Sequence, residues 1–185
     1  MASPQIDASK VFEQGDCFFQ TLAILRNAVG PDDVQLSVTI GEPAIVIGAL
    51  TIELFLKCLA CIETGAVPWG HNLKELYDAL SPATRARIQQ NWDNDILVHR
   101  KSEWDRIEEG LGRQIARDLP FALAAGSKTF ERIRYSYEGN TADLQYFLHD
   151  LPQLLEQVIL EQKPEWTGLR RAYRPLTSSI PRSKD

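Results

Sequence analysis

The apolar residues of this chain recur mostly at the spacing of helices, and one stretch of them is unusually long. Residues 43–62 are apolar almost throughout and carry only two charges, Glu53 and Lys57. Pro43 suits the first turn of a helix, and Gly65 suits the residue just past its end. A helix that is apolar on nearly all sides belongs in the middle of a bundle, so we expect this segment to be buried.

Six more segments show the helical pattern, and we expect them to surround this central helix. They cover, in chain order, residues 9–29, 73–80, 82–92, 103–119, 120–139 and 142–162. The residues expected to cap them are Asp7 or Ser9, Asn72 or His71, Ser81, Ser102 and Thr141. Pro152 is expected to bend the last helix, because proline lacks the N–H of an internal hydrogen bond.

The alternation typical of a β-strand occurs at one place, Val34 to Ile40, with the sequence VQLSVTI. One short, isolated strand cannot form a sheet. The pattern therefore predicts an all-α fold, a bundle of five to seven helices.

The chain has 185 residues, enough for one domain with a core of its own. We expect the bundle to occupy residues 1–162 and an arm rich in Pro, Ser and Arg to occupy residues 163–185, lying on the bundle or disordered. The arm carries a net charge of +4 and the bundle −9. Trp166 and Tyr173 in the arm suit weak binding of nucleic acid, but covering the acidic body of its own or a neighbouring chain is the favoured reading.

The first ten residues, MASPQIDASK, lack the pattern of a secretory signal. Residues 43–62 are long enough to span a membrane, but Glu53 and Lys57 would each cost about 2.5–3.5 kcal/mol near its centre. The sequence therefore predicts a cytoplasmic protein without a membrane role.

The chain has three cysteines, and Cys58 and Cys61 form a C-x-x-C pair inside a helical segment. No second pair completes a zinc site, so we expect core cysteines in a reducing compartment. The sequence also lacks a P-loop, a G-x-S-x-G motif, an H-E-x-x-H motif and an EF-hand loop. No cofactor or metal is expected.

A family resemblance rests on three short motifs between about residues 40 and 160. They are E-x-x-x-K in the apolar helix, then G-H-x-L-x-x-L-Y, then R-Y-x-Y-E. The matching residues are Glu53, Lys57, Gly70, His71, Leu73, Leu76, Tyr77, Arg134, Tyr135, Tyr137 and Glu138. This pattern resembles bacterial HEPN-like proteins (higher eukaryotes and prokaryotes nucleotide-binding). The resemblance implies an antiparallel helical bundle, a homodimer, and a role in RNA cleavage, nucleotide binding or defence.

The chain departs from the catalytic members of that family. They carry Arg, four to six intervening residues and His on one helix, so that both side chains meet at a scissile phosphate. None of the three histidines, His71, His99 and His149, follows an arginine at that spacing, and no histidine follows Arg134 at it. The ribonuclease motif is absent, and no catalytic residue is assigned.

Two couples at helical spacing, Glu53 with Lys57 and Arg134 with Glu138, suggest an interhelical polar network. We expect it to hold three helices in register, with His71 and Tyr135 or Tyr137 nearby. The alternatives are the floor of a pocket for a nucleotide or another anion, and simple solvent exposure. For His71 itself, an N-cap or packing role is favoured over acid–base chemistry. The tryptophans Trp69, Trp92 and Trp104 are expected to pack against helix ends rather than to stack on bases.

The leading functional hypothesis is a HEPN-like binding or regulatory protein, a homodimer whose ligand is RNA or a nucleotide. One alternative is a structural or partner-binding scaffold without a small-molecule site. Another is an atypical hydrolase of RNA or a nucleotide that uses His71, Arg134 and Glu138. A pocket joining those three residues favours the hydrolase, and a dry, fully paired network favours the scaffold.

Overall fold

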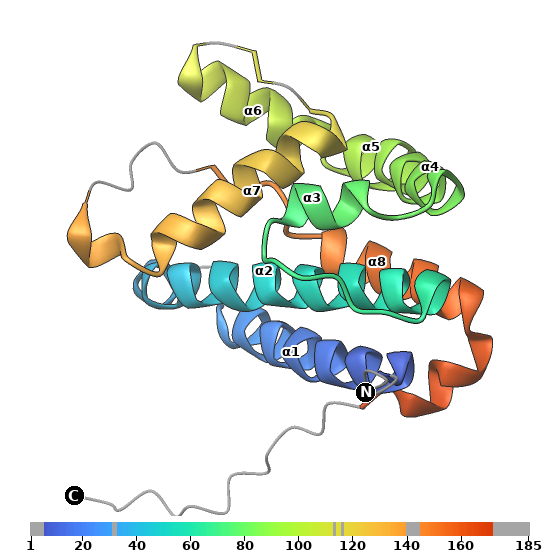
Figure 1. Cartoon of the computed structure of the whole chain (residues 1–185). Coiled ribbons are helices and arrows are strands. Elements are labelled where there is room, and N and C mark those ends of the chain that lie inside the picture. Colours follow the sequence, from blue (N-terminus) through green and yellow to red (C-terminus); the bar gives the residue numbers. More distant parts are fainter. Residues whose placement is uncertain (1–5, 31–32, 113, 116, 140–144, 172–185) are drawn as a thin grey trace, which may run out of the picture.

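A computed structural model describes residues 6–30, 33–112, 114–115, 117–139 and 145–171 of the chain (Figure 1). In these ranges every regular element is helical, which confirms the predicted all-α fold. The α-helices are α1 (Ala8–Ala28), α2 (Val34–Thr64), α3 (Leu73–Asp78), α4 (Pro82–Asn91), α5 (Leu97–His99), α6 (Lys101–Leu111), α7 (Leu119–Ile133) and α8 (Leu151–Gln162). A π-helix, η1 (Trp92–Ile96), joins α4 to α5, and η2 (Ser136–Glu138) and η3 (Pro164–Leu169) are 3-10 helices.

The helices α1 and α2 lie side by side and run in opposite directions (Figure 1). Asp7 caps α1 as predicted, because its carboxylate accepts a hydrogen bond from the N–H of Ser9. Phe12 of α1 stacks on Phe55 of α2 with ring centroids 6.0 Å apart. Gly15 permits this approach, since a Cβ at that position would lie 2.6 Å from the Phe55 ring.

The central helix α2 begins earlier than the sequence predicts. Asp33 caps it and accepts a hydrogen bond from the N–H of Leu36 over 2.9 Å, so the segment proposed as a strand is helical. The predicted start at Pro43 is therefore wrong, and Pro43 lies inside the helix. The predicted end is confirmed, because Gly65 adopts a φ of 74° directly after Thr64.

The helix α2 contacts α1, α3, α7 and α8 (Figure 1). Its buried residues include Phe55, Leu56 and Leu59, and both Cys58 and Cys61 belong to the core as predicted. Burial raises the pKa of the Cys58 thiol to about 12. Among the described residues, α2 alone is long and apolar enough to cross a membrane, and 61% of its most apolar window is buried inside the protein.

The two segments directly after α2 begin where the sequence predicts. Asn72 caps α3 through the N–H groups of Lys74 and Glu75, and Ser81 caps α4 with Pro82 at its first position. The segment expected to stop near Trp92 continues instead as the π-helix η1. Trp92 is fully buried, and its indole N–H donates to the backbone carbonyl of Arg117, two residues before α7.

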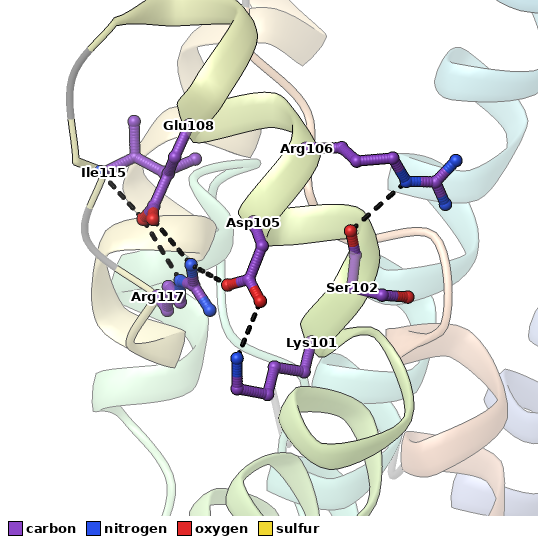
Figure 2. A network of polar contacts seen from close by, with 7 residues as sticks. All are labelled: Lys101, Ser102, Asp105, Arg106, Glu108, Ile115 and Arg117. Carbon is purple, nitrogen blue, oxygen red and sulfur yellow. Dashed lines mark hydrogen bonds and ion pairs between the residues drawn. The ribbon is translucent and has the colours of Figure 1, made fainter.

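The boundary between α6 and α7 differs from the prediction, because Gly112 ends α6 with a φ of 64°. Asp118 then caps α7. The capping box expected at Ser102 is also wrong. Its carboxylate, Asp105, accepts no hydrogen bond from the backbone N–H of Ser102 but binds the side chains of Lys101 and Arg117 (Figure 2).

Arg117 closes the connection between α6 and α7. Its guanidinium donates to both oxygens of Glu108, at 3.1 and 2.6 Å, and to Asp105 at 2.7 Å (Figure 2). These bonds raise the pKa of Arg117, and the bond to Glu108 is the largest cause. The same bond lowers the pKa of the Glu108 carboxyl. The connection is therefore held by charge-assisted hydrogen bonds in place of helix.

The helix α8 is shorter than predicted. It begins at Leu151, so Pro152 lies in its first turn and bends nothing, in agreement with the preference of proline for helix starts. The cap predicted at Thr141 and the start predicted at Ala142 lie outside the described residues.

The first part of the C-terminal arm, residues 163–171, lies on the bundle, which is one of the two arrangements expected. Trp166 lies 5.6 Å from the ring of Phe12. Arg170 makes two hydrogen bonds to the buried Glu156, and the N–H of Arg171 donates to the buried Asp16 over 2.7 Å. The remainder of the arm, from residue 172, is outside the described residues.

Candidate functional site

Glu53 and Lys57 lie one turn apart on the buried half of α2. The Lys57 ammonium donates to Glu53 Oε1 over 2.8 Å, as their spacing predicts. Glu53 is only 3% exposed. An ionised carboxylate at this depth needs partners, because burial takes away its water. Lys57 is the first of them.

The loop of residues 66–72 brings His71 to the same carboxylate. Gly65 directly precedes this loop and Gly70 lies near its end. Their φ values are 74° and 95°, which glycine adopts without strain. They turn the chain back over α2, and His71 Nδ1 lies 2.9 Å from Glu53 Oε1. His71 is therefore not the cap of α3 but the second partner of Glu53.

One nitrogen of the His71 imidazole contacts Glu53, and the rest of the ring is open to solvent. Its side chain is 74% exposed, although the carboxylate that it contacts is 4% exposed. An ionised carboxylate only accepts hydrogen bonds, so Nδ1 carries the hydrogen of this bond and Nε2 is left for other partners. A carboxylate placed in this way fixes the orientation of a histidine ring.

The second oxygen of Glu53, Oε2, is buried and has no hydrogen-bond partner among the described residues. Leaving a buried acceptor unpaired costs roughly 1–3 kcal/mol. Glu53, Lys57 and His71, which we call the Glu53 cluster, are therefore brought together without forming a fully paired network.

Trp69 lies in the same loop, two residues before His71, and it is 99% exposed. The prediction that it packs against a helix end is wrong. The other two tryptophans considered from the sequence are buried. Trp92 donates to the carbonyl of Arg117, and Trp104 packs against Phe147 with ring centroids 4.7 Å apart. The loop thus presents an indole and an imidazole to solvent, two residues apart in sequence.

The R-Y-x-Y-E residues lie elsewhere, at the end of α7. Arg134 donates to the carbonyl of Phe130 in its own helix, and its guanidinium lies 4.7 Å from the Phe130 ring and 5.9 Å from that of Tyr135. Tyr135 and Tyr137 are 51% and 79% exposed and contact each other edge to face. Glu138 lies in η2, also on the surface.

The predicted network of Glu53, Lys57, Arg134 and Glu138 is not formed. Among the described residues, no hydrogen bond or ion pair joins Arg134 or Glu138 to the Glu53 cluster.

One reason is that α7 ends at Ile133, so Arg134 and Glu138 do not share a helix face. A second is position: Ser136 bonds to Glu42, and about 16 Å of α2 separates Glu42 from Glu53 at about 1.5 Å per residue. The R-Y-x-Y-E residues and the Glu53 cluster therefore lie at different places along α2.

Sequence reasoning missed two cavities, one between η1, α5 and α8 and one between α1, η1, α6 and residues 146–150. Their lining residues come from separate segments of the chain, so no local sequence motif predicts these cavities. Elsewhere in the described residues, no group of three or more His, Cys, Asp and Glu side chains is arranged to hold a metal ion.

No protein-family model, curated protein or solved structure matches this chain. The resemblance to HEPN-like proteins therefore stays a prediction from the three short motifs.

Proposed function

We propose that this is a HEPN-like binding protein that holds single-stranded RNA or a nucleotide on the loop of residues 66–72. In this proposal a base stacks on Trp69, and His71 contacts the neighbouring phosphate or ribose. The observation that carries it is the fully exposed Trp69, two residues before an imidazole that a buried carboxylate keeps in place.

The indole provides most of the binding energy in this proposal. Every base has a π-face, so stacking on an exposed aromatic side chain tolerates any sequence and contributes about 1–3 kcal/mol per base. An exposed tryptophan without such a partner leaves a large apolar surface in water. A ligand base covers that surface.

The polar part of the site suits a single phosphate or a ribose hydroxyl. His71 offers Nε2 as donor or acceptor, and the Lys57 ammonium binds the same oxygen, Glu53 Oε1, as His71 does. Because the bundle carries a net charge of −9, few phosphates can be bound by it. We therefore expect the bundle to bind RNA with a weak dependence on salt.

The test is the binding of a fluorescently labelled oligouridine to the full chain, measured by anisotropy. We expect Trp69→Ala to raise Kd by roughly 5- to 150-fold, the equivalent of the stacking energy. Tyr137→Ala is the matched control, because Tyr137 is also exposed but lies at the end of α7. Equal Kd values for the two variants would contradict the proposed site.

A second chain, ending at Arg171, separates the loop from the basic arm. Ending the chain after Arg171 keeps the contacts of Arg170 with Glu156 and of Arg171 with Asp16. We expect the truncated chain to retain the effect of Trp69→Ala and to lose most of the salt dependence. Binding that disappears with the arm would instead assign the RNA contact to residues 172–185, and no binding by either chain would favour the scaffold.

The hydrolase alternative keeps one observation in its favour. A histidine whose Nδ1 rests on a buried carboxylate has the orientation of a general base. The set of three residues expected from the sequence is not assembled, since Arg134 and Glu138 lie apart from His71. Cleavage of the oligouridine by the full chain, lost in His71→Gln and kept in His99→Gln, is the result that this alternative requires.

A further inference from the structure

Two neighbouring cavities meet at the end of η1. The larger lies between η1, α5 and α8, and the smaller lies between α1, η1, α6 and residues 146–150. Their volumes are about 430 and 310 Å³, within the range of small-molecule sites. Three residues, Ile96, Arg100 and Asp150, line both of them, so the cavities share one wall. Ile96 is the last residue of the π-helix η1, and π-turns occur frequently at functional sites.

The shared wall is a fixed ion pair. Arg100 donates to both oxygens of Asp150, at 2.8 and 2.9 Å, and to Glu103 at 3.0 Å. These bonds, with the one to Asp150 as the largest cause, raise the pKa of Arg100. Arg100 is thus occupied by two carboxylates, and it has little capacity left for a ligand.

Arg26 is the other arginine of the smaller cavity, and it is not occupied in this way. It donates to the backbone carbonyl of His149 over 2.6 Å, and no carboxylate among the described residues lies within hydrogen-bond distance. Burial is the largest cause that lowers the pKa of Arg26. A guanidinium has five N–H donors, so Arg26 can receive an anion without giving up the bond to His149.

Aromatic rings form another side of the same cavity. Trp104 and Phe147 lie with centroids 4.7 Å apart and an interplanar angle of 31°, and both line it. Rings in this arrangement accept a further flat ring by offset stacking. The cavity therefore combines a flat apolar surface with a guanidinium that makes no hydrogen bond to a carboxylate, although Asp150 in the same lining attracts it.

We propose that the smaller cavity binds a planar aromatic carboxylate, with its ring against Trp104 and Phe147 and its carboxylate on Arg26. This site is independent of the RNA-binding loop. It assigns the protein a small-molecule ligand that the sequence does not announce.

The test is calorimetric titration of the full chain with phenylacetate, phenethyl alcohol and phenethylamine, which share the ring and differ in charge. We expect phenylacetate to bind most tightly and phenethylamine most weakly. Arg26→Gln should weaken phenylacetate about tenfold, the value of one charge-assisted hydrogen bond, and should leave the alcohol unchanged. Arg106→Gln is the matched control, since Arg106 also donates to a backbone carbonyl but lies outside the cavity (Figure 2).

A second variant, Ile107→Trp, fills the cavity and keeps its charges, because Ile107 lines it and is partly buried. It should abolish binding of phenylacetate and of the alcohol while the circular dichroism of the helices is kept. The proposal is overturned if phenethylamine binds as well as phenylacetate or if Arg26→Gln and Arg106→Gln behave alike. It is also overturned if no compound binds at about 10 mM, because compounds of this size bind at that concentration even with a modest binding energy per atom.

Discussion

At the scale of single residues, one buried carboxylate organises the candidate site. Glu53 Oε1 takes two donors, one from Lys57 in its own helix and one from His71 across the loop. The Lys57 bond follows from helical spacing and could be predicted. From the sequence, His71 could be expected near Glu53, but the bond itself could not be predicted. It depends on how two glycines fold a loop that contains no periodic pattern.

The importance of this carboxylate can be measured by removing its buried partner. We expect Lys57→Ala to lower the free energy of unfolding by about 3–5 kcal/mol, because it leaves Glu53 charged and underpaired at 3% exposure. The measurement is urea denaturation followed by circular dichroism. Lys74→Ala is the control, since Lys74 forms the same kind of pair with Asp78 on the surface, and such pairs contribute about 1 kcal/mol or less. Equal losses for the two variants would mean that Glu53 does not depend on Lys57.

At the scale of elements, the start of α2 shows where sequence patterns mislead. VQLSVTI alternates like a strand, and Pro43 resembles a helix start, yet the helix begins at Val34. The side chains of Val34 and Val38 are 73% and 70% exposed, so the alternation reflects no buried face. The cap at Asp33 and continuity with the buried half of α2 outweigh the local preference.

Because α2 begins at Val34, Pro43 lies inside the helix, where it destabilises the protein and can be replaced. Inside a helix, proline deprives the carbonyl of Thr39 of its donor and costs about 3 kcal/mol relative to alanine. We therefore expect Pro43→Ala to raise the free energy of unfolding, by roughly 1–3 kcal/mol, and to increase the helical circular dichroism. A loss of stability would instead indicate that Pro43 begins the helix.

Other elements were predicted in type but not in extent. The ends of α6 and α7 were misplaced because Gly112 and the residues after Ile133 leave the helix while their sequence remains compatible with it. Arg117 supplies part of the reason, as its bonds to Asp105 and Glu108 stabilise a non-helical connection. Such long-range pairs are invisible to periodicity.

At the scale of the whole molecule, the all-α fold followed from the sequence, whereas the site did so only in part. Glu53, Lys57 and His71 meet as the short motifs suggested. Arg134 and Glu138 do not join them, and the cavity beside η1 left no trace in the sequence. Residues gathered from several elements become neighbours only through packing, which a single sequence pattern does not encode.

The predicted homodimer also belongs to this scale. Val34 and Val38 are exposed and lie two turns and one turn before Glu42 on the same face of α2. Glu42 bonds to Ser136, which stands between the exposed Tyr135 and Tyr137. We propose that this face joins two copies of the chain. Light scattering after size exclusion should give twice the chain mass of 20.9 kDa, and Val38→Glu should give the single mass. A monomeric wild type, or a Val38→Glu chain that stays dimeric, would contradict this interface.

The central claim is that the loop anchored on Glu53 contacts RNA, and photochemical cross-linking tests it most directly. An oligonucleotide containing 4-thiouridine is irradiated with the full chain, the protein is digested with trypsin, and the linked peptide is identified by mass spectrometry. We predict the link on the peptide of residues 58–74, which contains Trp69 and His71. A link found only on peptides from the arm or from the end of α7 would contradict the account.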